Sequence, residues 1–574
     1  GQDRSLPRAL QALTPPGAGR VPLSRDRAEA AAEAFLRRHS VELFAASPSL
    51  DGPARLELRP LTTRRSRSGL HVWRQQYVDG VAVEDAYVHL RVDQAGRVRS
   101  LRSDWVPELP AGSPAAAVSA EEARRAVEAR VEAEGPTRVP AQVELVWSPR
   151  LQALTWRVLL PLWSPWGDWL AWVDARDGRV LDLTNIMVHG KPLGEAPRRS
   201  APEGPWTEST TAAPTATRVD GQGMALPANP LNGHPERYAL RDGDPVDAYR
   251  ESVLLPRLDG TGFLSGQWVD ARSTASDRAF DAGLTYSYSA DEVDSYFHEV
   301  NAYWHIDTFQ NYLQTDLGLL DANNRTQVIY AHGREDDNSV YSPASKAITF
   351  GDGGVDDAED GEIVLHEYGH AIHDDIVPGY LTSGQVAATS EGFGDYLSAT
   401  YGGNPLVGEW DATAYNPGPP PFLRRIDLDL HYPQDYVGQI HADGRIISGA
   451  WWRLRGELGA TVVDALVIES FFQLTTTSTF ADFADAMLQV DRDLFGGAHL
   501  AAIYDAYTDR GIQPSYGLSI AHTPLGDTND LAGPYRVEAV VSHASALAAA
   551  DPVQLYWRYG DSTEWNIQTM VKPR

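Results

Sequence analysis

The feature that most constrains this chain is a pair of histidines four residues apart in GEIVLHEYGHAIHDD, residues 361–375. On a helix, His366 and His370 project from one face, one turn apart, so both imidazoles can bind the same Zn²⁺. Glu367 lies beside them, where it can accept a proton from the attacking water of a hydrolytic reaction. The alternative is that both histidines lie on an ordinary surface helix.

A hydrolytic zinc site needs three protein ligands and one open position. The pattern that would add a third histidine fails, because His373 stands where it requires Gly and Ile376 where it requires His. His373 itself is expected to be solvated or to cap the helix. The next predicted helix offers Glu391 as the third ligand, and Asp395, one turn later, is expected to accept the second ring N–H of His366.

These motifs resemble those of a known family. HEYGH, 20 intervening residues and then EGFGD are similar to the fungalysin and thermolysin-like metallopeptidases, and to the bacterial fungalysin type in particular. The front of the chain is similar as well. QQYVDGVAVEDAYVHLRVDQAGRV looks like the FTP propeptide module, and residues 119–184, ending WLAWVDARDGRVLDL, look like the PepSY module that follows it. The likeness covers about residues 25–520.

The resemblance implies roles for residues around the cleft. Asn338 and Ser339, in a strand before the zinc helix, would pair with the substrate backbone by strand addition; the alternative is an ordinary edge strand. His441, in GQIHADGRIISGAWW, would donate a hydrogen bond to the oxyanion, or else it is structural. Either Arg424 or Arg425 would bind the carbonyl beyond the scissile bond.

Two cofactors are expected. One is a single catalytic Zn²⁺. The other is Ca²⁺, because the acidic run GDGGVDDAEDGE at 351–362 offers the oxygen ligands that a hard cation prefers. The alternative for this run is a solvated acidic surface.

The pattern predicts an α+β multidomain chain. Helix plus antiparallel sheet occurs twice near the front, with helices at 25–38 and 119–134, which suggests two small α+β propeptide modules. They would precede a two-lobed thermolysin-like catalytic domain, with a mixed β N-lobe, a helical C-lobe and the zinc helix between them. The expected division is an FTP-like module at 1–110, a PepSY-like module at 111–188, a linker with the maturation region at 189–217, the catalytic domain at 218–521 and a β-rich C-terminal segment, resembling part of a β-sandwich, at 522–574.

Charge and composition exclude several classes. The net charge of −29 argues against nucleic acid as a partner, because a binder needs a basic face. No apolar run reaches the roughly 18 residues of a membrane span. The chain has no cysteine, so disulfides, thiolate zinc sites and a propeptide thiolate that blocks the zinc are all excluded.

The charge is unevenly distributed along the sequence. Residues 1–200 carry a net charge of +4 and residues 201–574 a net charge of −33. The simpler interpretation is that the acidic charge keeps the protein in solution. The sharper one is that the first third docks on the acidic remainder through complementary charge.

The function that follows is a secreted, extracellular zinc endopeptidase precursor that hydrolyses protein or peptide substrates. Its own propeptide would act as an intramolecular inhibitor and folding aid, cut autocatalytically within 189–217 or just after. The chain begins Gly-Gln without a signal segment, so we expect that a signal peptide has been removed or the sequence trimmed. The alternatives are a catalytically inactive binding or adhesion protein that keeps the fold, and a structural zinc site in a surface protein.

Overall fold

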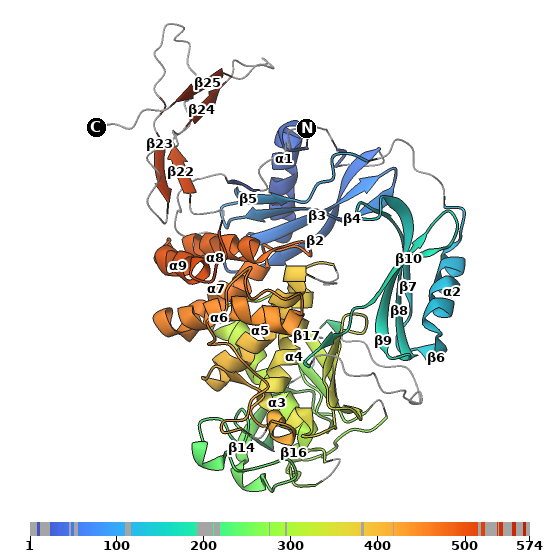
Figure 1. Ribbon diagram of the computed structural model, residues 1–574, viewed down its shortest axis with the longest axis vertical. Coiled ribbons are helices and arrows are strands. Elements are labelled where there is room, and N and C mark those ends of the chain that lie inside the picture. Colours follow the sequence, from blue (N-terminus) through green and yellow to red (C-terminus); the bar gives the residue numbers. More distant parts are fainter. Residues whose placement is uncertain are drawn as a thin grey trace.

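The computed structural model describes residues 9–11, 23–44, 48–50, 55–109, 116–191, 210–211, 218–274, 276–292, 295–379, 384–416, 418–514, 518–522, 537, 539–543, 554–557 and 566–569. It is a mixed α/β structure in which strands dominate the first part and helices the later part (Figure 1). Among the described residues, no helix is both long enough and apolar enough to cross a membrane.

The first part of the chain, residues 23–187, is called the N-terminal part below. Its helices and strands are α1 (Arg25–Phe44), β2 (Leu56–Arg65), β3 (Leu70–Val78), β4 (Val81–Val92), β5 (Val98–Ser103), α2 (Ala120–Val131), β6 (Glu134–Thr137), β7 (Gln142–Ser148), β8 (Ala153–Ser164), β9 (Gly167–Asp174) and β10 (Val180–Asn185). The predicted capping box at the start of α2 is confirmed, since Ser119 and Glu122 bond reciprocally.

The two helices of the N-terminal part pack on separate hydrophobic cores, but the strands form one sheet. Ala32 and Leu36 of α1 pack with Leu90 of β4, whereas Val127 of α2 packs with Val158 of β8. Strand β4 also pairs in parallel with β7, which makes one ten-stranded sheet. Its main path has the order β1-β5-β4-β7-β8-β9-β10, where β1 is Ala9–Gln11; in addition, β3 pairs with β2 and β4, and β6 pairs with β8. The two helix-plus-sheet units predicted from the sequence are therefore joined edge to edge.

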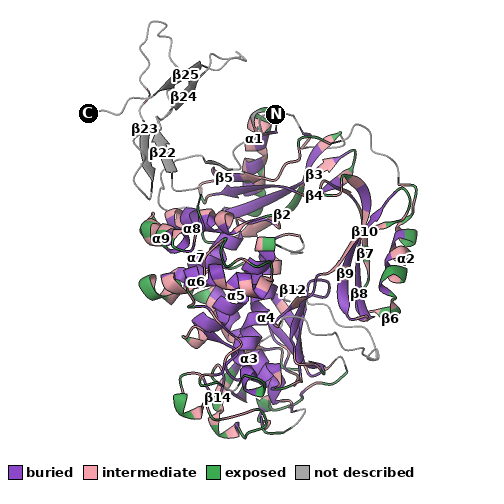
Figure 2. Ribbon diagram, viewed as in Figure 1, coloured by how far each residue is buried: buried purple, intermediate pink, exposed green. Residues whose placement is uncertain are grey.

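Residues 218–514 form the main body. Its strands are β13 (Val219–Ala225), β14 (Glu251–Leu258), β15 (Val269–Arg272), β16 (Thr285–Tyr286), β17 (Arg325–Arg334), β18 (Val340–Ser342), β19 (Ala347–Gly351), β20 (Leu406–Val407) and β21 (Arg424–Arg425). Its helices are α3 (Phe297–Thr315), α4 (Gly361–Ile376), α5 (Gly384–Gly402), α6 (Ile440–Leu458), α7 (Ala460–Phe471), α8 (Phe480–Phe495) and α9 (Leu500–Thr508). Figure 2 shows that α4 and α5 lie deep inside it, and nearly all their described side chains are buried.

One strand from the front of the chain belongs to the sheet of the main body. Strand β11 (Val188–His189) pairs with β18 at the edge of a six-stranded sheet of order β11-β18-β19-β17-β12, where β12 is Thr210–Thr211 and β15 pairs with β17. The chain thus leaves the N-terminal sheet after β10 and enters the main body directly.

The N-terminal part also contacts the main body through charged side chains. Arg64, Arg91 and Arg102 pair with Asp375, Asp493 and Asp482 respectively. In addition, the carboxylate of Glu469 in α7 accepts hydrogen bonds from residues 66–68. These contacts favour the interpretation that the mildly basic first third docks on the acidic remainder.

Beyond residue 514, two antiparallel hairpins are described: β22 (Leu518–His522) with β23 (Ala539–His543), and β24 (Gln554–Trp557) with β25 (Asn566–Thr569). The strand-like runs predicted at 534–541, 552–558 and 564–571 overlap three of these strands. Strand β22 was not predicted, and it crosses the expected domain boundary at 521/522.

Candidate active site

The predicted ligands converge between α4 and α5. His366 Nε2 lies 3.1 Å from His370 Nε2 and 3.4 Å from Glu391 Oε2, and His370 Nε2 lies 3.8 Å from Glu391 Oε1. All three side chains are buried. The structure therefore brings together the two imidazoles and the carboxylate that the sequence singled out.

The second nitrogen of each imidazole is already engaged. His366 Nδ1 lies 3.1 Å from Asp395 Oδ1, and His370 Nδ1 lies 3.0 Å from the hydroxyl oxygen of Ser390. A carboxylate can only accept, so the Nδ1 of His366 carries a proton, and its Nε2 is the nitrogen that faces the centre of the group. The Nε2 of His370 faces the same point, which is the arrangement of two metal ligands.

Glu391 supplies a test of whether these residues fit a cation. Neither of its carboxylate oxygens has a hydrogen-bond partner within the described part of the chain, although the side chain is buried. A buried carboxylate without a partner is costly unless a cation neutralises it. The donor set of two imidazole nitrogens and one carboxylate oxygen therefore fits Zn²⁺.

The pKa values of these groups follow from their neighbours. Burial raises the pKa of Glu391, but His441, His370 and His366 outweigh it and bring that pKa to about 2. Burial lowers the pKa of His370 to about 3, so its imidazole is neutral. Burial also lowers the pKa of His366, but the neighbouring carboxylates of Asp395 and Glu391 raise it to about 9. A metal at this site must displace the His366 proton, so its binding is coupled to pH.

Glu367 lies on the same helix with its carboxylate turned into the cleft. The side chain is fully buried, and neither oxygen finds a hydrogen-bond partner among the residues described. Burial raises the pKa of Glu367, His366 lowers it and Glu391 raises it, and the net result is a pKa of about 8. A carboxylate whose pKa lies near neutrality can both take up and release a proton, as a general base requires.

Glycines let α4 and α5 approach closely enough to form the site. A Cβ added at Gly369 of α4 would lie 3.0 Å from the Cα of Gly394 in α5. A Cβ at Gly394 would in turn lie 2.6 Å from His366 Nδ1. The second glycine of EGFGD, Gly394, is thus required by the close packing of α5 on the His366 ring.

Residues 188–191, called the cleft segment below, lie across this site. Val188 and His189 pair antiparallel with Tyr341 and Val340, and the backbone N–H of Gly190 donates to Ser339 O at 3.1 Å. The side-chain amide of Asn338 binds the backbone of Lys191 twice: Asn338 Oδ1 accepts from Lys191 N at 3.0 Å, and Asn338 Nδ2 donates to Lys191 O at 3.2 Å. The strand predicted to pair with a substrate therefore pairs with a segment of its own chain.

Two further side chains hold the carbonyls of the cleft segment. Gln439 Nε2 donates to His441 Nδ1 at 2.9 Å, which leaves His441 Nε2–H free to donate to the carbonyl of His189 at 2.6 Å. Arg424 Nη1 donates to the carbonyl of Gly190 at 2.7 Å. A Cβ at Gly190 would lie only 2.5 Å from Glu367 Oε1. The His189–Gly190 peptide bond thus lies between the donors and Glu367.

The structure distinguishes the two candidate arginines. Arg424 is buried and also donates to both oxygens of Asp395 through Nε. Arg425 turns outward and pairs with Asp427. Adjacent strand residues face opposite sides, so only Arg424 reaches the cleft.

Three other expectations have different outcomes. The prediction that His373 is solvated or caps the helix is wrong, because its side chain is fully buried against Phe471, with ring centroids 4.4 Å apart. The resemblance to thermolysins also implies a cleft Tyr between the zinc helix and Glu391; Tyr380 is available there, although not at the matching spacing, and lies outside the described residues. Ser390, the partner of His370, was missed, although it directly precedes Glu391.

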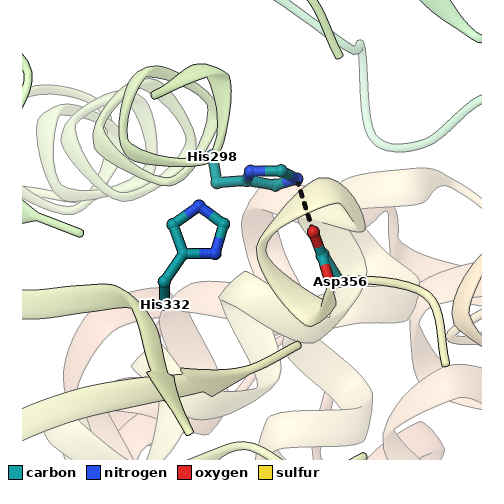
Figure 3. A group of neighbouring side chains, drawn as sticks. All are labelled: His298, His332 and Asp356. Carbon is teal, nitrogen blue, oxygen red and sulfur yellow. Dashed lines mark ion pairs between the residues drawn. The ribbon is translucent and has the colours of Figure 1, made fainter. Parts of the chain in front are cut away.

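A second group of possible metal ligands is formed by His298, His332 and Asp356, which converge from three segments (Figure 3). His298 Nε2 lies 3.3 Å from Asp356 Oδ2. His332, however, uses both nitrogens: Nδ1 lies 2.9 Å from Asp352 Oδ1 and Nε2 donates to Ser295 O at 3.1 Å. Burial lowers the pKa of His332, but Asp352 outweighs it and raises that pKa to about 9. Both nitrogens of His332 thus have partners outside the group, so this group fits a cation less well than the first.

The acidic run at 351–362 is divided among several roles. Asp356 faces His298, and Asp357 contributes to a group with Asp337 and Asp411. Asp360 caps α4 through the backbone N–H of Glu362 at 2.9 Å. Calcium at this run stays a prediction.

Comparison with known proteins gives weak similarity to one kind of enzyme. No protein-family model matches the chain. Over 380 residues it is 25% identical to a bacillolysin from Bacillus caldolyticus and to a thermolysin from Alicyclobacillus acidocaldarius subsp. acidocaldarius, covering 58% of this chain and 61% of each relative. A bacillolysin from Bacillus amyloliquefaciens is 22% identical over 378 residues, covering 60% of this chain and 62% of the relative. The chain spans about three fifths of the length of these curated relatives, and the similarity supports a thermolysin-like metallopeptidase.

Among solved structures, the Bacillus megaterium YpeB C-terminal domain matches 29% of this chain and 67% of its own chain at 13% identity. Its TM-score of 0.19 is too low to carry an argument about the fold.

Proposed function

We propose that this chain is the precursor of a thermolysin-like zinc endopeptidase, with the metal bound by His366, His370 and Glu391. The observation that carries the proposal is the convergence of two imidazole Nε2 atoms and a buried carboxylate beside Glu367. Three protein ligands leave one position open, as hydrolysis requires. Zn²⁺ held by these groups would supply Lewis-acid chemistry that polarises a peptide carbonyl and acidifies a water molecule.

The residues around the metal would divide the remaining work. Glu367 would take a proton from the attacking water and pass it to the leaving amine. His441 would donate to the carbonyl oxygen as negative charge develops there. Asp395 would hold the tautomer and orientation of His366. No side chain in this arrangement acts as a nucleophile, so no covalent acyl-enzyme is expected.

Substrates would bind by adding a strand to the edge of the sheet at β18, as the cleft segment does. Asn338 and Ser339 would read the backbone of the substrate, and Arg424 would hold the carbonyl beyond the scissile bond. Backbone pairing gives affinity with little dependence on sequence, which suits an endopeptidase of protein or peptide substrates.

The cleft segment would make the N-terminal part an intramolecular inhibitor. It fills the positions of a substrate strand, so an external peptide cannot bind until it leaves. His441 donates to the carbonyl of His189, and Arg424 donates to the carbonyl of Gly190. The peptide bond between these two residues is therefore the proposed site of autocatalytic maturation. It lies at the start of the predicted 189–217 maturation region.

The finer assignments remain proposals. We propose an FTP-like module at 1–110 and a PepSY-like module at 111–188, each supported by its own hydrophobic core. A catalytic domain at 218–521 and a β-rich segment at 522–574 would follow. The resemblance in sequence supports the bacterial fungalysin type and secretion to the extracellular space, and the acidic run at 351–362 supports a bound Ca²⁺.

Zinc content and casein hydrolysis test the function together. The full chain should bind one Zn²⁺ and hydrolyse casein, lose this activity to a chelator and regain it with Zn²⁺. His370→Ala should bind no zinc, whereas His431→Ala, at a half-exposed histidine, should behave as the parent does. One bound zinc without casein hydrolysis would indicate an inactive binding protein, and no bound zinc would overturn the metal centre.

A further inference from the structure

The side chain of Lys191 enters an acidic pocket next to the cleft. Its ammonium pairs with Asp337 and lies 2.8 Å from Asp411 Oδ1 and 3.2 Å from Asp357 Oδ1. The ring of Tyr415 lies 5.5 Å from the same nitrogen, within reach of a cation–π contact. Three carboxylates from separate segments therefore surround one positive charge.

The pocket is built and largely shielded from solvent. The side chains of Asp357 and Asp411 are fully buried, and that of Asp337 is 35% exposed. Ser339 Oγ donates to Asp357 Oδ2 at 2.6 Å, and Tyr415 OH donates to Asp411 Oδ2 at 3.2 Å. These contacts fix the carboxylates but leave the pocket with an excess of negative charge, which a cation would offset.

The cation that the structure places there comes from the cleft segment itself. Asn338 holds Lys191 at both its N–H and its carbonyl, so the side chain is directed into the pocket by the same backbone pairing that defines the cleft. Lysine occurs in this sequence only at 191, 346 and 572, and arginine serves elsewhere. A compact ammonium is the group that three converging carboxylates can surround, whereas a planar guanidinium prefers a side-by-side pair of oxygens.

We infer that this pocket recognises a basic side chain, lysine above all, at the second residue after the scissile bond of a substrate. The inference rests on the proposed function, because Lys191 takes that position only if His189–Gly190 is the bond to be cut. It narrows the substrate class to proteins and peptides with a lysine two residues after the cleavage point. The self-cleavage site would be the first such substrate.

A set of matched peptides tests the pocket. After the full chain has matured in the presence of Zn²⁺, quenched fluorescent peptides that differ only at the second residue after the cleaved bond should be compared, with Lys, Met or Glu there. We expect kcat/KM for the Lys peptide to exceed that for the Met peptide by about 30-fold or more, because only the Lys side chain can form ion pairs with the largely buried carboxylates. The Glu peptide should be cleaved more slowly than the Met peptide.

Two variants tie the preference to the pocket. Asp411→Asn should reduce the ratio of Lys to Met cleavage toward one, and Asp337→Asn should reduce it less, because Asp337 is partly solvated. Asp429→Asn, at an Asp with a 90% exposed side chain, should keep the ratio of the parent. A ratio that persists in Asp411→Asn would overturn the assignment of the pocket.

A casein assay in the same preparation separates the two possible failures. Casein hydrolysis with equal rates for the Lys and Met peptides would overturn the pocket and leave the proposed function intact. Equal rates accompanied by tight Ca²⁺ binding that Asp411→Asn abolishes would identify the three carboxylates as a metal site instead. No hydrolysis of casein or any peptide would overturn the endopeptidase, and the pocket as a substrate site with it.

Discussion

The N-terminal part and the cleft segment contact the main body in different ways. The N-terminal part contacts it through side chains, both by ion pairs such as Arg91 with Asp493 and by a shared apolar cluster that includes Trp163 and Tyr330. The cleft segment is held chiefly through its backbone, by Ser339, Asn338 and Arg424. Ion pairs hold one particular partner, whereas backbone contacts suit any extended peptide. The first contact therefore resembles a dock and the second a bound substrate, and variants should separate the two.

The largest effect is expected at Glu367. Replacing Glu367 with Ala should leave the chain full length in the presence of Zn²⁺, with a loss in self-cleavage rate of about a thousandfold, because a general base contributes effects of this size. Glu457→Ala, at a half-exposed residue on α6, should mature like the parent. Gel analysis over time measures both. Spontaneous maturation of Glu367→Ala would refute self-processing.

A smaller effect, confined to the cleft, should separate the adjacent arginines. Arg424→Ala removes a donor to the Gly190 carbonyl and leaves the buried Asp395 without its cation, so kcat/KM for peptides should fall by about 100-fold. Arg425→Ala removes only an exposed pair with Asp427 and should stay within about twofold of the parent. Thermal unfolding of both variants checks the fold. Equal losses in kcat/KM would contradict the assignment.

Lys191 tests whether the cleft segment is held by its backbone alone. Lys191→Met keeps every main-chain hydrogen bond but leaves the three carboxylates without their cation, so self-cleavage should slow by about 30-fold. Lys346→Met, in the turn between β18 and β19, breaks a pair with Asp374 of α4 and serves as the matched control. An unchanged rate for Lys191→Met would mean that the backbone contacts suffice.

The smallest effect on cleavage is expected at the contact between the N-terminal part and the main body. Asp493→Asn leaves the nearly buried guanidinium of Arg91 without its carboxylate, which should lower the free energy of unfolding by about 3 kcal/mol. The self-cleavage rate should change by less than about twofold at a temperature where both proteins are folded, because the cleft contacts are intact. Denaturant unfolding and gel analysis provide the two numbers. A tenfold slower cleavage would show that the contact between the N-terminal part and the main body also positions the cleft segment.

Sequence spacing could predict the metal ligands because helical periodicity determines them. His366 and His370 share a face at a separation of four, and so do Glu391 and Asp395. The same periodicity could have predicted that His373 is buried, since it lies seven residues after His366 and returns to that face. The choice between Arg424 and Arg425 could not be made, because a strand alternates its faces and the sequence does not say which one is inward.

The occupant of the cleft depends on tertiary structure and could not be read from the sequence. Nothing in the local pattern of residues 188–191 indicates that they pair with a strand some 150 residues later. The one available signal was the rarity of lysine, which marks Lys191 in a chain that otherwise uses arginine. Asp337 and Asp411 are far apart in sequence and become a pocket only through the fold.

Mass spectrometry of the full chain after incubation with Zn²⁺ tests the central claim most directly, because it reads the new N-terminus. The cleft geometry predicts a fragment that begins at Gly190, absent without Zn²⁺. A chain that binds zinc yet stays intact, or one cut only at a bond away from the cleft segment, would contradict the account.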